Sequence, residues 1–361
     1  MGFLYLPIII FGILFLVTGL LILLDYLLGG SQEKTITING DNQLVVYGDD
    51  TVLSTLASNK VYLPSACGGK ATCGTCKFRL IDDVPGVKPT EEPFLSPQEI
   101  EDGVRLSCQQ KVKPDMKIVL PPGLLSARDF ETVIEEMEDL TYDIKRIKFK
   151  LIEPNTIDFK PGQFMQIKVP GIEVVRAYSL ASNPSHKDYV EMIVRYVPNG
   201  QATTFVHKAL EVGDKITLIG PFGDFFLQED SNKPIVCIAG GSGKAPIRSI
   251  LFRLKELGMK RDVKYFFGAR SKRDLYYTDE FLELEKEFPN FKYIPALSEP
   301  QESDNWTGEV GLITDVLDRN VGDLSGHEGY LCGSPGMIKA CINVLNKHDI
   351  KEENVYFDNF S

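Results

Sequence analysis

The sequence predicts a multidomain protein with a single N-terminal transmembrane helix, a small α+β domain, an antiparallel β-barrel and an α/β doubly wound domain. Three observations support this order. The chain begins with a long uncharged run, continues with short strand patterns between turn residues, and changes after Lys233 to apolar strands that alternate with helices. The expected domain boundaries are 1–30, 31–128, 129–230 and 231–361.

Composition narrows the class of protein before any motif is considered. The 361 residues include 39 basic and 50 acidic side chains, and the net charge of −11 argues against nucleic acid as a partner. The four histidines show no spacing typical of metal ligands. A hydrophobic content of 43% is ordinary for globular domains with one added apolar segment.

The uncharged run extends from Phe3 to Leu24. At about 1.5 Å per residue, a helix of this length matches the roughly 30 Å hydrocarbon core of a bilayer. A cleaved signal peptide is the alternative, but no basic segment precedes the run and no small-x-small cleavage site follows it. The first lysine, Lys34, comes after the run, so we expect a permanent single-pass anchor with a cytoplasmic body.

The small domain should contain a sheet, one or two helices and a loop rich in cysteine. Strand patterns occur at 35–38, 44–47 and 77–81, and a helical pattern occurs at 51–59. A second helix should begin at Ser96-Pro97, where serine can cap the first turn and proline suits the first helical position.

Four cysteines of this domain follow the spacing C-x5-C-x2-C-x31-C, namely Cys67, Cys73, Cys76 and Cys108. Three thiolates in one short loop with a fourth further along indicate a 2Fe-2S cluster, although the first gap is one residue longer than in plant-type sites. Glycines in the loop let the backbone approach the sulfurs. A structural zinc site is the main alternative, but it usually shows two separated Cys-x-x-Cys pairs, and disulfides are less favoured still.

From Phe130 to Leu227 strand patterns recur with turn residues between them, which suggests an antiparallel barrel. The expected strands are 144–151, 163–169, 190–197 and 216–219. The acidic stretch between Glu131 and Asp139 is interpreted as a solvated face at the entry to the domain.

Two motifs of the barrel could bind an anionic cofactor. Arg176-Ala177-Tyr178-Ser179 follows a strand, and it offers a cation for a pyrophosphate, a ring for stacking and a hydroxyl for a ring nitrogen. The segment from Gly200 to Thr204 precedes a helix and offers a second anion site. Ordinary strand and turn composition is the alternative for both motifs.

In the last domain, the apolar run 234–239 predicts a strand covered on both faces. It leads into a glycine-rich turn, Gly240-Gly241-Ser-Gly243-Lys244-Ala-Pro246, and then into an amphipathic helix over 247–257. Further strands are expected at 263–267, 293–296 and 329–332. A turn between a buried strand and a helix favours phosphate binding, with a plain tight turn as the alternative. Lys244 either adds charge near a pyrophosphate or projects to solvent.

Taken in order, these motifs resemble the ferredoxin–NADP reductase superfamily. The matching phrases are Arg-x-Tyr-Ser at 176–179, Gly-x-x-Thr at 200–203, Gly-Pro-Phe-Gly at 220–223, Gly-Gly-x-Gly-x-Ala-Pro at 240–246 and Cys-Gly-Ser-Pro at 332–335. The x5 cysteine loop, the anchor and the C-terminal Phe357-Asp-Asn-Phe360 narrow the resemblance to the F subunits of sodium-translocating NADH:quinone reductases. The departures from that pattern are Ser334 in place of proline, Lys244 in place of an apolar residue, and a short segment between Pro170 and Arg176.

The resemblance implies a ferredoxin-like (β-grasp) domain whose four cysteines hold the 2Fe-2S cluster, a flavin-binding barrel and a nucleotide-binding α/β domain. FAD would be held by Arg176, Ala177, Tyr178, Ser179, Gly200 and Thr203. NADH would be held by Gly240, Gly241, Gly243 and Gly333. The residues at the reacting rings would be Tyr178, Ser179, Cys332 and Phe360. Simple packing is the alternative for Cys332 and Phe360, and packing is the interpretation for Cys237 and Cys341.

The implied activity is oxidation of NADH by FAD, which then passes single electrons to the cluster. The protein would be the entry subunit of an inner-membrane quinone reductase, with integral-membrane redox subunits as partners and quinone as final acceptor. Two alternatives stay open, a stand-alone membrane-tethered reductase that supplies an oxygenase or desaturase, and a non-catalytic redox sensor. Lys272 and Arg273 could meet the 2′-phosphate of NADPH, although the resemblance favours NADH.

Overall fold

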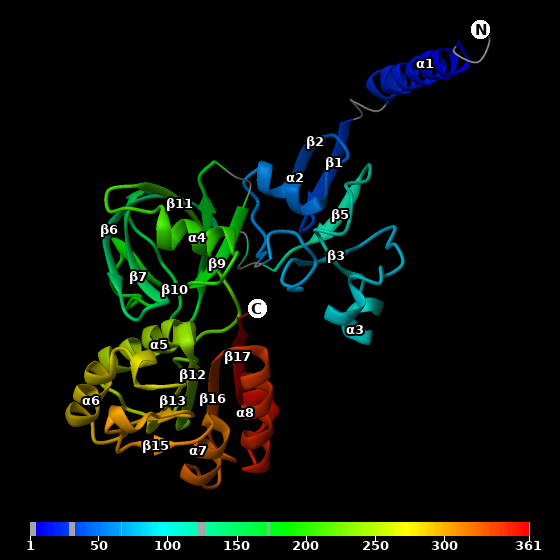
Figure 1. The fold of residues 1–361 in the computed structure, drawn as a ribbon. Helices are drawn as coiled ribbons and strands as arrows, with labels where there is room; N and C mark the ends of the chain where they lie inside the picture. Colours follow the sequence, from blue (N-terminus) through cyan, green and yellow to red (C-terminus); the bar gives the residue numbers. More distant parts are fainter. Residues whose placement is uncertain are drawn as a thin grey trace. The chain divides into compact units, whose positions relative to one another are not determined.

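The computed structural model describes residues 5–28, 33–65, 67–121, 124, 127–171 and 174–360 (Figure 1). The chain forms two compact units. The first unit comprises Met1–Leu63 and Gly69–Leu125, and the second comprises Pro64–Gly68 and Ser126–Ser361.

Helix α1 (Tyr5–Leu28) covers most of the uncharged run, and its apolar side chains from Ile10 to Leu21 are exposed. Within the part of the chain that the structure describes, no helix meets the length and hydropathy needed to cross a membrane. The single-pass anchor therefore stays a prediction.

A five-stranded mixed sheet forms the body of the first unit, in the order β2-β1-β5-β3-β4. Strand β1 pairs antiparallel with β2 and parallel with β5. The strands are β1 (Glu33–Ile38), β2 (Asn42–Tyr47), β3 (Lys77–Leu80), β4 (Val104–Leu106) and β5 (Met116–Val119). The three strands predicted from alternation are confirmed, whereas β4 and β5 were not predicted.

The two helices of this unit begin where the sequence predicts. Helix α2 (Val52–Ser58) is capped by Thr51, whose hydroxyl accepts the N–H of Ser54. Helix α3 (Pro97–Glu101) has a capping box between Ser96 and Glu99. The apolar side of α2 is buried with the strands in one core, which includes Ile36, Val52, Leu56, Phe78 and Ile118.

Six antiparallel strands of the second unit form a nearly closed barrel, in the order β10-β7-β6-β11-β8-β9. A bridge between Leu180 and Met192 links the two ends of this order. The strands are β6 (Arg128–Asp139), β7 (Ile144–Glu153), β8 (Phe164–Val169), β9 (Val174–Ser179), β10 (Tyr189–Arg195) and β11 (Lys215–Phe222). Helix α4 (Gln201–Lys208) packs on β9 and β10.

The acidic stretch is not only a solvated face, because it forms most of strand β6. Its carboxylates pair with basic side chains of the neighbouring strand β7. Arg146 contacts Glu136 at 2.9 Å and Glu138 at 3.0 Å, and Lys148 contacts Glu135 at 2.8 Å. Cross-strand ion pairs therefore let a highly charged segment join the sheet.

The last six strands form a parallel sheet in the order β15-β14-β13-β12-β16-β17 (Figure 1). They are β12 (Ile235–Gly240), β13 (Val263–Ala269), β14 (Phe291–Leu297), β15 (Glu309–Val310), β16 (Glu328–Gly333) and β17 (Val355–Asn359). The helices are α5 (Lys244–Glu256), α6 (Thr278–Glu287), α7 (Ile313–Asn320) and α8 (Pro335–Lys347).

Two hydrophobic cores lie on opposite faces of this sheet, which confirms the predicted doubly wound arrangement. Along β12, Ile235, Cys237 and Ala239 join the core shared with α5 and α6, whereas Val236 and Ile238 join the core shared with α7 and α8. Cys237 and Cys341 are fully buried in these cores, as their packing interpretation expects.

Candidate functional site

The strand ladder of the first unit brings two of the predicted cluster ligands together. Cys76 directly precedes β3 and Cys108 closely follows β4, and these two strands pair antiparallel. Cys76 and Cys108 are buried, and Cys67 and Cys73 are half-buried. The contact between the two buried thiols, together with burial, raises the pKa of Cys76.

The loop fits a metal cluster in two respects. Thiols that are buried close together favour the neutral form. A bound iron ion would reverse this preference, because iron binds cysteine as the thiolate. Gly69 and Gly74 adopt left-handed backbone with φ of +85° and +68°, and a Cβ on Gly74 would lie 2.7 Å from the Phe94 side chain. The wrapped loop therefore depends on glycine.

Among the described residues, no three His, Cys, Asp or Glu side chains are grouped so that they could hold a metal ion. Cys67 lies in the segment 64–68, which belongs to the second unit. The complete ligand set of four cysteines therefore stays a prediction.

Glu91 supports the segment that carries Cys108, and sequence reasoning missed it. Its buried carboxylate accepts the N–H of Leu106 at 2.8 Å, the N–H of Lys88 at 3.0 Å and the side-chain amide of Gln110 at 3.0 Å. Removing this carboxylate would leave several buried donors unsatisfied. Glu91 lies in a loop that contains Pro85, Pro89 and Pro93, and this loop has no periodic pattern that could reveal the role.

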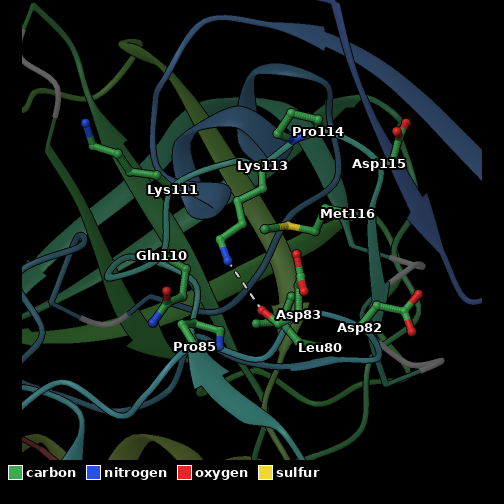
Figure 2. A pocket seen from close by; sticks show the side chains of 10 residues that line it. All are labelled: Leu80, Asp82, Asp83, Pro85, Gln110, Lys111, Lys113, Pro114, Asp115 and Met116. Carbon is green, nitrogen blue, oxygen red and sulfur yellow. Dashed lines mark hydrogen bonds between the residues drawn. The ribbon is translucent and has the colours of Figure 1, made fainter.

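A small cavity of about 190 Å³ lies elsewhere in the first unit (Figure 2). Its lining includes carboxylates of Asp82, Asp83 and Asp115 beside the amino groups of Lys111 and Lys113. Lys113 donates to the carbonyl of Asp83 at 3.4 Å. None of the predicted site residues lines this cavity.

Strand β9 carries the Arg-Ala-Tyr-Ser motif and pairs with β8. Arg176 donates to the carbonyl of Val175 at 2.8 Å, and in the described part of the chain no carboxylate forms an ion pair with it. Tyr178 packs against the barrel core, and burial raises its pKa to about 12 although Arg176 opposes the rise. The guanidinium of Arg176 is thus available to an anion such as a pyrophosphate.

Gln166 offers a second indication that the barrel binds a polar group. It lies opposite Ala177 in the β8–β9 ladder and is buried. Within the described residues its Nε2 has no hydrogen-bond partner. Because buried donors seldom stay unpaired, this amide fits a ligand that carries hydrogen-bond acceptors, as a flavin ring does.

The second predicted anion site lies at the start of α4, which packs against β9. Gly200 is the N-cap residue, and as a glycine it has no side chain that could cap the helix. Thr203 instead braces the turn, because its hydroxyl accepts the N–H of Val197 at 3.2 Å. A Cβ on Gly200 would lie 2.6 Å from that hydroxyl oxygen, so a larger residue there would displace the Thr203 side chain.

The predicted phosphate turn lies at the carboxyl end of β12, where η4 (Gly241–Gly243) leads into α5. Gly241 has φ of +56°, and a Cβ on Gly243 would lie 2.3 Å from the carbonyl oxygen of Cys332. Close packing of the turn on β16 therefore excludes any other residue at position 243. Open α/β sheets bind their ligands at this edge.

The positions of two basic side chains near this turn were not predicted from the sequence. Lys244 is fully buried, so the alternative that it projects to solvent is wrong. Arg195 of the barrel lies beside the turn, because a Cβ on Gly241 would be 3.4 Å from its Nη1. The Nε of Arg195 pairs with Asp143 at 2.8 Å, which fixes its direction.

Four of the predicted residues gather around Asp358, which was not predicted. Asp358 lies opposite Cys332 in the β16–β17 ladder and accepts a hydrogen bond from Ser179 Oγ at 3.4 Å. The N–H of Phe360 donates to the carbonyl of Gly333 at 2.9 Å. The serine of the barrel motif thus meets the carboxyl edge of the α/β sheet.

The pKa values of both acidic groups in this cluster are raised. Burial, followed by the charge of Asp358, raises the pKa of the Cys332 thiol well above its usual value. Burial also raises the pKa of Asp358 to about 6, although the hydroxyl of Ser179 lowers it. Cys332 is therefore a neutral buried thiol rather than a nucleophile.

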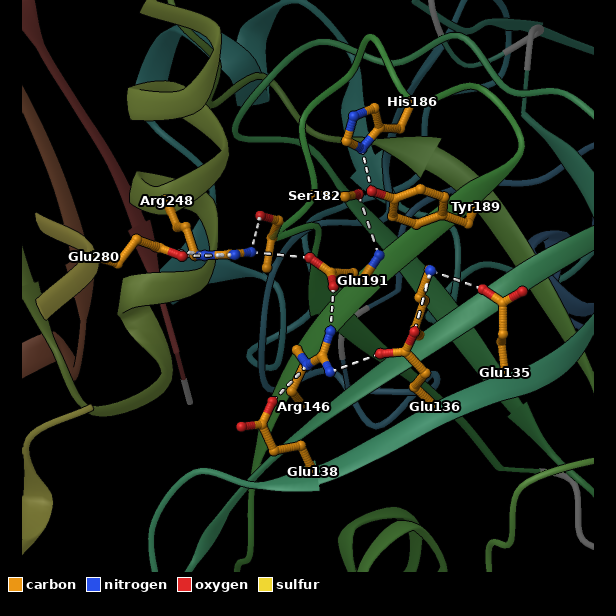
Figure 3. Close-up of polar contacts among 12 residues, drawn as sticks. Glu135, Glu136, Glu138, Arg146, Ser182, His186, Tyr189, Glu191, Arg248 and Glu280 are labelled. Carbon is orange, nitrogen blue, oxygen red and sulfur yellow. Dashed lines mark hydrogen bonds and ion pairs between the residues drawn. The ribbon is translucent and has the colours of Figure 1, made fainter. Parts of the chain in front are cut away.

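An ion-pair network joins the barrel to the α/β sheet (Figure 3). Glu191 of β10 lies between Arg146 of β7, at 2.6 Å, and Arg248 of α5, at 2.9 Å. Arg248 also pairs with Glu280 of α6 at 2.9 Å and donates to the carbonyl of Ala181 at 3.2 Å. The helix that follows the phosphate turn is therefore fixed to the barrel.

Three family models match successive parts of the chain. They are the 2Fe-2S iron-sulfur cluster binding domain over 36–113, the oxidoreductase FAD-binding domain over 131–227 and the oxidoreductase NAD-binding domain over 237–342. The three cofactors expected from the sequence, a 2Fe-2S cluster, FAD and NADH, are confirmed by these matches.

Similar proteins extend over nearly the whole chain. The F subunit of the Na(+)-translocating NADH-quinone reductase of Pseudomonas paraeruginosa is 36% identical over 91% of each chain, and that of Neisseria meningitidis is 33% identical over 98% of each chain. Among solved structures, a cytochrome P450 reductase of Amycolatopsis aligns with a TM-score of 0.75 and 29% identity, over 91% of this chain and 98% of that chain. The ferredoxin reductase of a carbazole 1,9a-dioxygenase aligns with a TM-score of 0.70 and 26% identity, over 91% of this chain and 99% of that chain.

Proposed function

The chain belongs to the family of F subunits of Na(+)-translocating NADH-quinone reductases, and from that premise we propose that it is the NADH-oxidising entry subunit of a membrane quinone reductase. Its partners would be integral-membrane redox subunits, with quinone as the final acceptor. The exposed apolar side chains of α1 support attachment to the inner membrane by a single helix, with the catalytic body on the cytoplasmic side.

The observation that carries this proposal is the meeting of the Arg-Ala-Tyr-Ser strand with the carboxyl edge of the parallel sheet. Ser179 of the barrel contacts Asp358 of β17, and Cys332 lies beside both the phosphate turn and Asp358. A flavin held by β9 and a nucleotide held by the turn would therefore present their rings to the same cluster of residues.

Each group of residues has a distinct role in the proposed site. Arg176, Gly200 and Thr203 would hold the FAD pyrophosphate, and Ala177 and Gln166 would face its ring system. The turn from Gly240 to Gly243 would hold the NADH pyrophosphate, with Gly333 and Cys332 beneath it. Tyr178, Ser179 and Phe360 would cover and orient the rings, and Cys67, Cys73, Cys76 and Cys108 would hold the cluster.

When bound, the flavin supplies the conversion of a two-electron hydride donor into single electrons for the cluster. In the proposed site the Cys332 thiol keeps its proton, because burial raises its pKa well above the usual value, and Asp358 is protonated below about pH 6. No residue of the cluster is needed as a general base, since hydride transfer leaves no proton to remove.

The test is an anaerobic titration of the full-length protein in detergent, first with NADH and then with NADPH, followed by the visible spectrum. Bleaching of both flavin and cluster absorption by NADH is the expected result. Bleaching of the flavin alone, with zinc found by metal analysis, would refute the cluster assignment. A spectrum unchanged by either nucleotide would refute the proposed activity.

A second function is favoured by the solved structures. The Amycolatopsis cytochrome P450 reductase and the carbazole dioxygenase reductase both align along 91% of this chain, so a stand-alone reductase that supplies an oxygenase has the same three-part architecture. Purification of the tagged chain from its native membrane distinguishes the quinone reductase subunit from the stand-alone reductase. Stoichiometric integral-membrane subunits support the quinone reductase, whereas a chain that purifies alone and reduces a soluble acceptor supports the alternative.

A further inference from the structure

Lys244, the first residue of α5, is buried, and no carboxylate of the described residues forms an ion pair with its amino group. Its side chain is 0% exposed. Four aromatic rings surround Nζ, with centroids at 3.6 Å for Phe267, 4.6 Å for Tyr276, 5.2 Å for Phe281 and 5.6 Å for Tyr293. Burial of a lysine amino group is costly unless its donors are satisfied, so this environment requires an explanation.

We call these four rings the aromatic cage, and this cage and its polar atoms offer a partner to each N–H of the amino group. Nζ donates to the carbonyl oxygen of Tyr276 at 2.5 Å and lies 3.3 Å from the hydroxyl of Tyr293. A third N–H of the ammonium form would face the π surface of Phe267. The neutral amine also fits, because the Tyr293 hydroxyl can then donate to the nitrogen lone pair. The same geometry thus accepts both protonation states.

The cage is connected directly to the phosphate turn. Lys244 follows Gly243 in the chain, and its amino group holds the backbone of Tyr276. The hydroxyl of Tyr276 in turn donates to the carbonyl of Gly241 at 2.7 Å. Lys244 and Tyr276 therefore hold both ends of the turn from its protein side.

Among the described groups that face the cage, Lys244 is the one whose charged form is opposed by burial while its neutral form is also accommodated. Burial lowers the pKa of Lys244 well below its usual value, while Glu280 of α6 raises it and Arg248 of α5 lowers it. Burial raises the pKa values of Tyr265, Tyr276 and Tyr293, so these phenols stay neutral. Arg195, which acts on Tyr276, stays charged.

We propose that Lys244 positions the phosphate turn and takes up a proton when a dinucleotide pyrophosphate binds there. The nitrogen lone pair of Nζ accepts a proton from solvent and becomes an ammonium, which offsets part of the charge of the arriving pyrophosphate. The inference rests on the proposed nucleotide site. It identifies a residue that couples nucleotide affinity to pH.

The first test measures proton uptake in the full-length protein in detergent. ADP-ribose is titrated calorimetrically in buffers of different ionisation enthalpy, because this ligand carries the pyrophosphate but transfers no hydride. Net proton uptake is expected, with binding that weakens as pH rises through the pKa of the free enzyme. A shift of about one pKa unit on binding would weaken affinity about tenfold across that window. Binding of ADP-ribose without proton uptake would overturn the inference.

The second test compares Lys244→Met with Lys255→Met, an exposed position on the same helix that pairs with Glu287. Lys244→Met should abolish proton uptake and flatten the pH profile of binding, and Lys255→Met should keep both. If Lys244→Met kept wild-type proton uptake, the assignment to Lys244 would be wrong. If it failed to fold, the wild-type calorimetry would still decide the question. Absence of any binding of ADP-ribose and NADH to the wild type would overturn both this inference and the proposed function.

Discussion

Ser179 of strand β9 and Asp358 of strand β17 meet across the boundary between the barrel and the parallel sheet, with Ser179 Oγ 3.4 Å from Asp358 Oδ2. They are far apart in the sequence, and their hydrogen bond joins the Arg-Ala-Tyr-Ser strand of the barrel to the carboxyl edge of the parallel sheet. The contact depends on β17, the last strand, reaching this edge in parallel register with β16.

Asp358→Asn should remove a pH dependence of stability. Burial raises the pKa of Asp358 to about 6, so its neutral form contributes stability that is complete below about pH 4 and is lost as pH rises towards 6. Asparagine stays neutral, so the variant should be more stable at neutral pH by about 3 kcal/mol. Urea unfolding followed by flavin release, repeated across this range, measures the difference. Parallel pH profiles for the two proteins would contradict the assignment.

Cys76→Ala should abolish the cluster spectrum and lower bound iron, because a buried member of the ligand set is lost. Reduction of the flavin by NADH should persist in anaerobic stopped-flow measurements. Cys341→Ala is the matched control, since Cys341 is equally buried but lies in helix α8 of the nucleotide domain. Loss of flavin reduction in Cys76→Ala with the flavin still bound would show that the proposed order of transfer is wrong.

Arg176→Ala should weaken flavin retention by about tenfold to a hundredfold, the usual effect of losing a charge-assisted hydrogen bond. Lys168→Ala is the control, because Lys168 is an exposed cation opposite Val175 on the neighbouring strand. The measurement is the flavin content after dialysis, with the dissociation constant from fluorescence. Equal retention in both variants would remove the role assigned to Arg176.

Gly243→Ala should strongly impair NADH binding, because the new Cβ would lie 2.3 Å from the carbonyl oxygen of Cys332 and the turn must move. Gly336→Ala, in the first turn of α8, meets nothing within 4 Å and should leave binding intact. The apparent KM for NADH and the rate of flavin reduction are measured for both variants and compared. A normal KM in Gly243→Ala would show that the turn does not hold the nucleotide.

Glu191→Gln should destabilise the second unit by about 2 kcal/mol, since it removes the carboxylate that half-buried Arg146 and buried Arg248 share, although each arginine keeps another carboxylate partner. Glu229→Gln removes the partner of Arg253 in a more exposed pair and should cost at most about 1 kcal/mol. Thermal unfolding of both variants at equal salt measures the contrast. Similar small effects would show that the network contributes little to joining the two domains.

Much of the fold could be predicted because local patterns coincide with tertiary structure. The buried run before Gly240 and the glycines after it reveal a strand, a turn and a helix, and the structure confirms all three. Strand β6 was missed because its carboxylates suggest a solvated surface, whereas its partners Arg146 and Lys148 lie on the next strand.

The site was predicted less completely, because partners across strands have no signature in one sequence. Asp358 is one acidic residue among many until β17 places it opposite Cys332. Lys244 resembles a surface lysine until α5 and the neighbouring aromatic residues enclose it. Glu91 and Gln166 likewise have roles that depend on elements distant in the chain.

The arginine–glutamate network around Glu191 limits which domains of this protein can be exchanged with those of a related protein. Arg248 and Glu280 come from the nucleotide domain, and Arg146 and Glu191 come from the barrel, so a chimera that exchanges only one of the two would inherit an unmatched buried charge. Barrel and nucleotide domain should therefore be transplanted, and should diverge in evolution, as one module, whereas the cysteine-bearing unit could be exchanged without breaking this network.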